Sequence, residues 1–392
     1  MTSASRVCFV TGTRADFGLL TGLIRVCKES SDFQVQLIAS CMHLDGRYGY
    51  TLNEIVGEGF ELSDTVPMLD ADSGRSAMVK SIADGMSKFV DVYDRLSPDL
   101  VIILGDRYEA LAAAQAASLM EVPVAHIHGG EVTEGALDDK IRHCITKLSS
   151  LHFVAAEEYR RRVIQMGEAP DSVFNVGSLG IENVRLVAKK SRAEVEEFLQ
   201  FSLGDKCLLV TCHPETVGVQ DQDYTSALFE ALENKLDLQV IFTYPNGDPG
   251  GQEIARKIDL FCSEHRGRAK AFKSLGFKRY IQTAHHVSAV LGNSSSALIE
   301  VPSIGVPSIN IGDRQKGRLR APSVIDVNWS KDNIQKAMDL ALTRDFRQLA
   351  NKKENPYGVG KTSLEIFKIL QCLKSVAIQK RGFFDLDVSY DA

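Results

Sequence analysis

The feature of this sequence that most constrains its fold is a regular alternation of short apolar runs with longer amphipathic stretches. The runs have the length of strands and end in glycine or polar residues. They lie at residues 7–10, 33–39, 99–104, 122–127, 151–155 and 172–176 in one half, and at residues 206–211, 238–242, 269–272, 287–291 and 307–311 in the other. Strands that alternate with helices form parallel sheets covered by helices. The pattern therefore predicts two Rossmann-like, doubly wound parallel α/β sheets that face each other across a cleft.

The predicted boundary between the two halves lies near residue 180. A chain of 392 residues is too long for one compact core. We expect an N-terminal domain over residues 1–180 and a C-terminal domain over residues 181–375. The tail that remains, residues 376–392, is charged and aromatic, and we expect it to pack back on the first domain.

Composition argues against several classes of protein. A formal net charge of −6 without a basic half argues against a general nucleic-acid binder. No apolar run approaches about 18 residues, so we expect no membrane span, and residues 1–6 lead into a strand without the apolar core of a secretory signal. The eight cysteines are scattered and form no CxxC pair, which indicates a reducing cytoplasm and neither a disulfide framework nor a structural zinc site.

An anion-binding site is indicated where an apolar run breaks at Gly292. Small polar residues that include Ser294 and Ser295 follow and open a predicted helix. Free N–H groups at the start of a helix and the helix dipole favour a phosphate. Glu300 lies about two turns further on, where a carboxylate suits the two hydroxyls of a ribose. The stretch therefore indicates a pocket for a nucleoside diphosphate, and the alternative is an ordinary N-cap on a core helix.

Other polar residues follow the ends of strands, where open α/β sheets bind their ligands. In the first half, Arg14 follows a strand–glycine turn that lacks a full GxGxxG pattern, so we expect a phosphate contact and no NAD site. His43 lies in the loop after the second strand as a candidate ligand contact. In the second half, His213 and Asn246 follow strands, and a basic loop with Arg318 fits a phosphate clamp.

Titratable residues of the first half form its predicted chemical centre. The residues that follow strand ends or start helices between positions 106 and 142 include Asp106, His128, Glu131, Asp138 and Arg142. Carboxylates so close together do not all stay ionised at neutral pH, so one can act as an acid and another as a base. The alternative is a metal site at His126 and His128. We favour a site without metal, because Arg14 and Arg142 can neutralise phosphate unaided.

Seven motifs, in this order and over nearly the whole chain, resemble those of the UDP-N-acetylglucosamine 2-epimerases. They are Thr-Gly-Thr-Arg-Ala-Asp at 11–16, Gly-Asp-Arg at 105–107, His-Gly-Gly-Glu at 128–131, Asp-Asp-x-Ile-Arg-His at 138–143, His-Pro at 213–214, Gly-Asn-Ser-Ser at 292–295 and Arg-Gln-x-Gly-Arg at 314–318. The non-hydrolysing relatives have a glutamate where this chain has His128, and a different motif at 314–318. Both departures resemble the hydrolysing branch, which makes N-acetylmannosamine for sialic acid synthesis. The resemblance implies the glycosyltransferase-B fold.

The resemblance also implies a two-step reaction without a redox cofactor. A base removes the C2 proton of UDP-N-acetylglucosamine while UDP leaves C1 by anti elimination, and water then adds to the resulting 2-acetamidoglucal to give N-acetylmannosamine. Proton transfer is implied for Asp106, Glu131 and Asp138, but which of them is the base stays open. His128, Arg142 and His213 complete the implied catalytic set, and the implied UDP-sugar contacts are Arg14, His43, Arg107, His213, Asn246, Gly292, Ser294, Ser295, Glu300 and Arg318. As in the family, we expect a homodimer or a homotetramer.

Three alternatives stay open. The first is the same reaction on a UDP-2,4-diacetamido sugar for legionaminic acid synthesis, because the loops around His43 and residues 132–134 do not identify the sugar. The second is a glycosyltransferase of the same fold, which would use the Ser-Ser stretch and Glu300 but would need an acceptor. The third is a nucleotide-sugar sensor. A sensor would keep its function after Asp106→Asn, whereas an epimerase would lose turnover and keep UDP binding.

Overall fold

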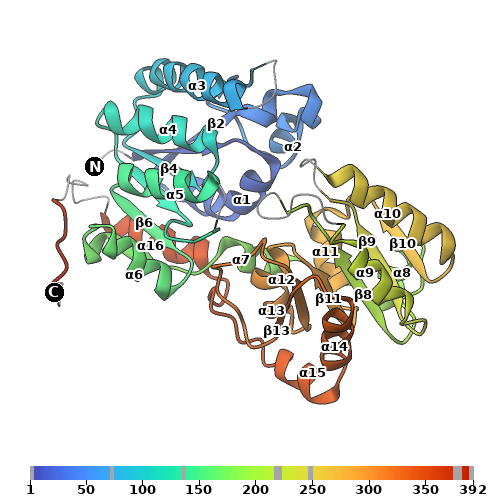
Figure 1. The fold of residues 1–392 in the computed structure, drawn as a ribbon. Coiled ribbons are helices and arrows are strands. Elements are labelled where there is room, and N and C mark those ends of the chain that lie inside the picture. Colours follow the sequence, from blue (N-terminus) through green and yellow to red (C-terminus); the bar gives the residue numbers. More distant parts are fainter. Residues whose placement is uncertain are drawn as a thin grey trace. The chain divides into compact units, whose positions relative to one another are not determined.

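The chain forms two compact units, each an α/β structure around one sheet (Figure 1). The computed structural model describes residues 4–70, 75–134, 137–215, 223–245, 250–373 and 382–387. Unit 1 comprises Met1–Glu131, Ala136–Leu179 and Gly360–Ala392, and unit 2 comprises Val132–Gly135 and Gly180–Val359. No helix in these described ranges is long and apolar enough to cross a membrane.

The sheet of unit 1 is parallel throughout, with the strand order β3-β2-β1-β4-β5-β6-β7. The strands are β1 (Ser5–Thr11), β2 (Phe33–Ser40), β3 (Asp64–Val66), β4 (Leu100–Leu104), β5 (Val124–Ile127), β6 (Leu151–Val154) and β7 (Val173–Asn175). Every residue of β4 is buried, as expected for a central parallel strand with helices on both faces. The strand order changes direction between β1 and β4, and ligands of such sheets bind at this point.

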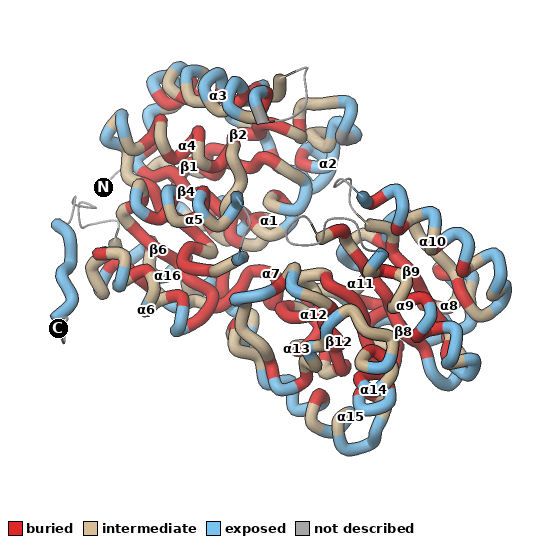
Figure 2. Tube along the Cα trace, viewed as in Figure 1, coloured by how far each residue is buried: buried red, intermediate tan, exposed pale blue. Residues whose placement is uncertain are grey.

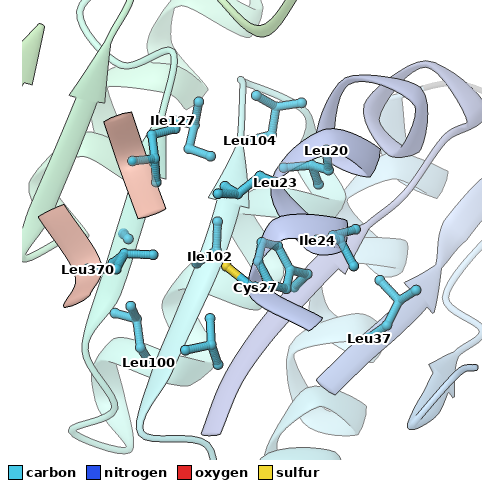
Figure 3. Packing of buried hydrophobic residues seen from close by; sticks show 14 of the residues in the cluster. Leu20, Leu23, Ile24, Cys27, Leu37, Leu100, Ile102, Leu104, Ile127 and Leu370 are labelled. Carbon is cyan, nitrogen blue, oxygen red and sulfur yellow. The ribbon is translucent and has the colours of Figure 1, made fainter. Parts of the chain in front are cut away.

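Helices cover both faces of this sheet. They are α1 (Arg14–Glu29), α2 (Leu52–Gly57), α3 (Arg75–Leu96), α4 (Tyr108–Leu119), α5 (Leu137–Leu148), α6 (Glu157–Gln165) and α16 (Thr362–Leu373), with the 3-10 turns η1 (Cys41–Leu44), η2 (Gly46–Tyr48) and η3 (Pro170–Ser172). On one face, α1 and α16 pack their apolar residues on the strands (Figure 3). On the other face, α3, α4 and α5 do so. The alanines of α4 have almost no exposed surface, and their small side chains let α3 and α5 approach closely.

Helix α16 corrects one part of the expected domain division. Residues 362–373 were expected in the C-terminal domain, but α16 belongs to unit 1, where it contacts α1. Leu370 and Ile366 are buried in the core of unit 1. The described part of the tail, residues 382–387, also contacts this unit. The N–H of Phe384 donates to the carbonyl of Gly167 at 2.9 Å, and the Lys147 ammonium lies 5.2 Å from the centre of the Phe383 ring.

Unit 2 has its own parallel sheet, with the strand order β10-β9-β8-β11-β12-β13. The strands are β8 (Cys207–Thr211), β9 (Gln239–Thr243), β10 (Ala269–Phe272), β11 (Ala289–Gly292), β12 (Ser308–Ile311) and β13 (Val324–Val327). The helices are α7 (Leu179–Leu186, whose first residue belongs to unit 1), α8 (Arg192–Leu199), α9 (Ser226–Glu233), α10 (Gly251–Glu264), α11 (Gly276–Ala284), α12 (Ser296–Ile299), α13 (Val301–Ile304), α14 (Lys331–Ala341) and α15 (Arg344–Ala350). The strand order changes direction between β8 and β11.

In both units the central strands are buried and the outer faces of the helices are exposed (Figure 2). The prediction of two doubly wound α/β domains with parallel sheets is therefore confirmed. The short strands β3 and β13 were not predicted. β3 has only three residues, and β13 is a four-residue strand at the edge of its sheet with one acidic residue, Asp326, and no buried position.

Candidate active site

The buried guanidinium of Arg142 organises the polar residues at the strand ends of unit 1. Arg142 lies on α5 with a side chain only 2% exposed. Its Nη1 donates to the carbonyl of Glu131 at 2.9 Å and to Oδ1 of Asp139 at 3.3 Å, and its Nη2 donates to Oδ2 of Asp106. A buried cation is stable only when it is paired and hydrogen-bonded. Arg142 therefore fixes the Asp106 carboxylate after β4 and the backbone at Glu131 after β5.

His128 and Glu131 form a pair beside this guanidinium. Nδ1 of His128 lies 2.8 Å from Oε1 of Glu131, and the side chains are 14% and 5% exposed. The backbone of His128 has a left-handed φ of 66°, which is uncommon for a residue other than glycine and is typical of functional turns. Its Nε2 is buried and has no hydrogen-bond partner among the residues that the structure describes. The carboxylate thus orients the imidazole and leaves one ring nitrogen for another partner.

His126, which the metal alternative required, is already satisfied inside the protein. Its Nε2 lies 2.7 Å from the carbonyl of Gly105, and its Nδ1 lies 3.2 Å from the hydroxyl of Thr146. Burial lowers the pKa of His126 to about 3, so the ring is neutral. Among the described residues, the side chains of Glu233, Glu264 and His265 lie close enough to share an ion, but they follow or end α9 and α10. The carboxyl ends of these helices lie near the amino ends of the strands, whereas sheets of this type bind ligands at the carboxyl ends of the strands.

Asp138 is in the first turn of α5, where the charge of Asp106 acts on it. Desolvation and the negative charge of Asp106 raise the pKa of Asp138, although the residue as a whole is exposed to solvent. A carboxyl group with a raised pKa is a candidate acid, whereas the Asp106 carboxylate is held by the Arg142 guanidinium. The two carboxyl groups are therefore in different electrostatic environments, as acid–base catalysis requires.

A second group of charged residues lies between β1 and β4, and two of its members, Asp16 and Glu109, were not predicted as site residues. Arg107, an expected substrate contact, donates from Nε to Oε1 of Glu109 at 2.5 Å. Glu109 is 2% exposed and lies against Gly12, where any Cβ atom would collide with the glutamate side chain. Asp16 in the first turn of α1 belongs to the same group, and burial and repulsion from Glu109 raise its pKa to about 7. The motif at 11–16 contained Asp16, but no sequence spacing links it to Glu109.

The structure revises the expectation for His43. The side chain is fully buried, and its Nε2 and Nδ1 lie 3.0 Å and 2.8 Å from the hydroxyls of Thr11 and Thr51. Burial lowers the pKa of His43 to about 4. Because both ring nitrogens are hydrogen-bonded to threonine hydroxyls, the His43 ring holds the loop after β2 in place and has no nitrogen left for a ligand. Arg14, by contrast, is 60% exposed and pairs with Glu54 at 3.1 Å.

In unit 2, Gly292 and Asn293 join the strand ends of β11 and β8. Gly292 has a φ of 137°, and a Cβ atom there would collide with the carbonyl of Thr211. Asn293 is fully buried, and its Oδ1 accepts the N–H of His213 at 2.7 Å while its Nδ2 donates to the carbonyl of His213 at 2.8 Å. One side chain therefore fixes the backbone of His213 on both sides.

The helix expected after the Ser-Ser stretch is divided in two. α12 spans only Ser296–Ile299, and α13 begins at Val301 because Pro302 has no N–H to continue the hydrogen bonds. The argument from the dipole of a long helix does not apply to so short a helix. Ser294, Ser295 and Glu300 are nevertheless all half-buried within this stretch of seven residues.

The loop after β12 packs against the start of the Ser-Ser stretch, at Asn293. Nε2 of Gln315 and Nη1 of Arg314 donate to the carbonyl of Asn293 at 3.0 Å and 3.3 Å. Arg318 is half-buried in this loop. Asn246, the remaining expected contact, lies outside the described residues.

These features define a class of α/β enzyme with parallel sheets and ligand groups at the strand ends. A family model described as UDP-N-acetylglucosamine 2-epimerase matches residues 25–371. The chain is 38% identical to a Campylobacter jejuni protein named GDP/UDP-N,N'-diacetylbacillosamine 2-epimerase (hydrolyzing), over 98% of this chain and 100% of the relative. It is 36% identical to the polysialic acid biosynthesis protein P7 of Escherichia coli, also over 98% and 100%.

A solved structure has the same fold. The UDP-GlcNAc 2-epimerase from Neisseria meningitidis, bound to UDP-GlcNAc, superposes with a TM-score of 0.80 at 18% identity, over 94% of this chain and 100% of that one. The chain therefore belongs to the UDP-N-acetylglucosamine 2-epimerase family, as its motifs indicated.

Proposed function

We propose that this protein is a hydrolysing 2-epimerase that converts UDP-N-acetylglucosamine and water into N-acetylmannosamine and UDP for sialic acid biosynthesis. The observation that carries the proposal is the Arg142-centred network of unit 1, which holds Asp106 and the Glu131 backbone beside the His128–Glu131 pair. A glycosyltransferase or a sensor of the same fold has no need for acid–base groups fixed in this way.

The chemistry requires two proton transfers at C2. In the first step a base takes the C2 proton and UDP leaves C1. The Asp106 carboxyl group is paired with Arg142, and Glu131 orients the His128 ring, whose Nε2 has no partner among the described residues, so these groups suit a base. In the second step the intermediate, 2-acetamidoglucal, receives a proton at C2 and a hydroxyl group from water at C1. Carboxyl groups with raised pKa values, such as Asp138, suit an acid.

We assign UDP binding to unit 2. The leaving diphosphate gains negative charge, which fixed donors and cations stabilise. Ser294, Ser295 and Arg318 supply hydroxyl and guanidinium donors, and the backbone of His213 is fixed by Asn293. The Glu300 carboxylate is the proposed acceptor of hydrogen bonds from the ribose hydroxyls. Arg14 and Arg107 of unit 1 are further proposed contacts to the substrate. No redox cofactor enters this scheme.

A second candidate substrate is UDP-N,N'-diacetylbacillosamine, a 2,4-diacetamido sugar nucleotide. The C. jejuni relative at 38% identity carries that substrate in its name, whereas the E. coli relative at 36% is named for polysialic acid. The two identities are too similar to separate the substrates. The same chemistry at C1 and C2 serves both, and the difference lies in the contacts at C4, which carries an acetamido group, and at C6, which lacks a hydroxyl.

Proton NMR in deuterated water, with each UDP-sugar alone and without acceptor, tests the proposal. Free N-acetylmannosamine deuterated at C2, formed in equal amount with UDP, supports hydrolytic epimerisation. Turnover of the 2,4-diacetamido sugar alone would assign the second substrate. If UDP binds and neither sugar reacts, the protein is a transferase or a sensor and the proposal is wrong.

Replacing Asp106 separates binding from catalysis. In Asp106→Asn the carboxylate paired with Arg142 is lost while its shape is kept. We expect the turnover rate to fall about 10²–10⁴-fold, with the dissociation constant of UDP little changed. The exposed carboxylate of Glu157 on α6 provides the control variant Glu157→Gln, which should keep full activity. Full activity of Asp106→Asn would contradict the proposed role.

We further propose that the enzyme acts in the cytoplasm as a homodimer or homotetramer. The proposal rests on the scattered cysteines, none of which forms a CxxC pair, and on the family resemblance. Light scattering at micromolar concentration gives the mass, and a monomer would contradict the proposed assembly.

A further inference from the structure

The carboxyl group of Asp16 lies at the point where the strand order of unit 1 changes direction. Asp16 is in the first turn of α1, which follows β1, and its N–H donates to the hydroxyl of the capping Thr13 at 3.2 Å. Asp106 follows β4, the next strand in the sheet. The cap therefore holds Asp16 near Asp106, which is a proposed base of the reaction. Asp16 itself has no role in the proposed function.

The neighbour of Asp16 on α4 is an immobile carboxylate. Glu109 is 2% exposed, its Oε1 accepts from Nε of Arg107 at 2.5 Å, and its Oε2 is buried without a partner in the described part of the chain. Gly12 leaves the space that this side chain fills. Arg107 interacts favourably with both Glu109 and Asp16, so one guanidinium serves two carboxyl groups.

Asp138, the other candidate acid, is exposed to solvent in the first turn of α5. Among the carboxyl groups that follow β1 and β4, the arrangement identifies the one that keeps a proton. The Asp106 carboxylate is paired with Arg142, and that of Glu109 is paired with Arg107. Asp16 forms no ion pair with any described side chain. Acidic groups that share too few cations retain a proton, and the group without its own cation is the one that retains it.

The other residues around Asp16 add no charge at neutral pH. Burial lowers the pKa of His43 on η1 to about 4 and raises that of Cys41 on the same turn to about 12. Arg14 of α1 pairs with Glu54. The charged groups that face Asp16 are therefore Glu109 and Arg107 at the start of α4, and Asp106 after β4.

We propose that Asp16 holds a proton in the resting enzyme and is the acid of the hydration step, donating this proton to C2 of the 2-acetamidoglucal. The proposal rests on the proposed function. Inversion at C2 requires the new proton to arrive on the face opposite to the one from which the first proton left. A base that has just taken a proton on one face cannot deliver it to the other face without moving, so a second group is needed.

The proton balance of this scheme is complete. The base takes the proton from C2 and later releases it to solvent, while the C1–O bond to UDP breaks. Asp16 gives its proton to C2, water gives its hydroxyl to C1, and the remaining proton of that water returns to the Asp16 carboxylate. Burial and repulsion from Glu109 raise the pKa of Asp16 to about 7, which agrees with a carboxyl that is partly protonated under working conditions.

The variant Asp16→Asn separates the two half-reactions. We expect UDP release from UDP-N-acetylglucosamine to continue, while formation of N-acetylmannosamine falls about 10²–10⁴-fold and 2-acetamidoglucal accumulates. Asp332, in the first turn of α14 in unit 2, supplies the matched control Asp332→Asn, which should release no 2-acetamidoglucal. NMR follows all three species in one sample.

A measurement on the unmodified enzyme gives an independent test. Hydration of added 2-acetamidoglucal, in the presence of UDP, requires the protonated Asp16. The rate should be constant well below pH 7 and fall tenfold per pH unit above it, because the acid form is lost as pH rises through the pKa of about 7. A rate that stays constant between pH 6 and 9 would overturn the role of Asp16 even if Asp16→Asn does not fold.

The remaining outcomes are distinguishable. If the unmodified enzyme releases no UDP from either UDP-sugar, the proposed function is wrong and the role of Asp16 falls with it. If the unmodified enzyme is active and Asp16→Asn forms N-acetylmannosamine at the same rate, only the role of Asp16 is wrong. Equal losses of UDP release and of N-acetylmannosamine, without accumulation of the intermediate, would also overturn it.

Discussion

Single side chains fix the polar residues of both units by holding backbone as well as side-chain atoms. Asn293 holds the N–H and the carbonyl of His213 from within the core of unit 2. Arg142 does the same in unit 1 for the carbonyl of Glu131 and the carboxylate of Asp106. Buried hydrogen bonds of this kind are costly to break, because the group left behind has no water to replace its partner.

The variant Asn293→Asp tests this role. It keeps the shape of the side chain but places an oxygen opposite the carbonyl of His213, in a fully buried position. We expect the dissociation constant of UDP to rise at least about tenfold, which corresponds to about 1.4 kcal/mol, and the stability of unit 2 to fall. Calorimetric titration with UDP measures the first effect. Asn333→Asp on the surface of α14 is the control, and an unchanged UDP affinity in Asn293→Asp would contradict the role.

The sequence predicts those site residues whose chemistry is visible in short motifs at the ends of predicted strands. Asp106, His128, Glu131 and Arg142 follow strand ends or start helices within a limited stretch, and the structure brings them together. The partnership of Asp16 with Glu109 could not be predicted, because it depends on which strands are neighbours and on the space above Gly12.

At the scale of elements, α16 is the part of the chain whose place could not be read from its sequence. Its apolar periodicity predicts a helix correctly, but periodicity does not say which sheet the apolar face will cover. The face of α16 completes the layer that α1 begins on unit 1 (Figure 3). The short strands β3 and β13 were missed for a related reason, since their pairing with β2 and β12 defines them more than their own residues do.

Leu370→Ala tests the assignment of α16 to the core of unit 1. Leu370 is 3% exposed, so its truncation should lower the free energy of unfolding by about 2–5 kcal/mol. Leu364 on the same helix is 43% exposed, and Leu364→Ala should cost about 0.5 kcal/mol or less. Urea denaturation with hydrogen exchange shows which unit loses stability. A loss confined to the strands of unit 2 would contradict the assignment.

At the scale of the whole molecule, the two units have separate cores and, under the proposed function, separate tasks. The cores share no residue, and each lies against its own sheet. The alternation of strands and helices was enough to predict both sheets, because every strand in them is parallel to its neighbours and needs a crossover.

Binding of UDP should therefore stabilise the molecule unevenly. At a UDP concentration of 100 times the dissociation constant, the free energy of unfolding of the binding unit rises by about 2.7 kcal/mol. We expect hydrogen exchange to slow most at the ends of β8 and β11 in unit 2, where His213 and Asn293 lie. Slowing confined to α1 and α4 of unit 1 would contradict the assignment of UDP binding to unit 2.

The interrupted course of the chain has a consequence during synthesis on the ribosome. Unit 1 begins at the N-terminus but needs α16, which is made after the whole of Gly180–Val359. The first strands to emerge therefore wait, with one apolar face uncovered where α16 will pack, until α16 itself has been synthesised. Unit 2, although second in the sequence, has nearly all of its residues in one stretch and can complete its core first. The order of folding is thus the reverse of the order in which the two units begin.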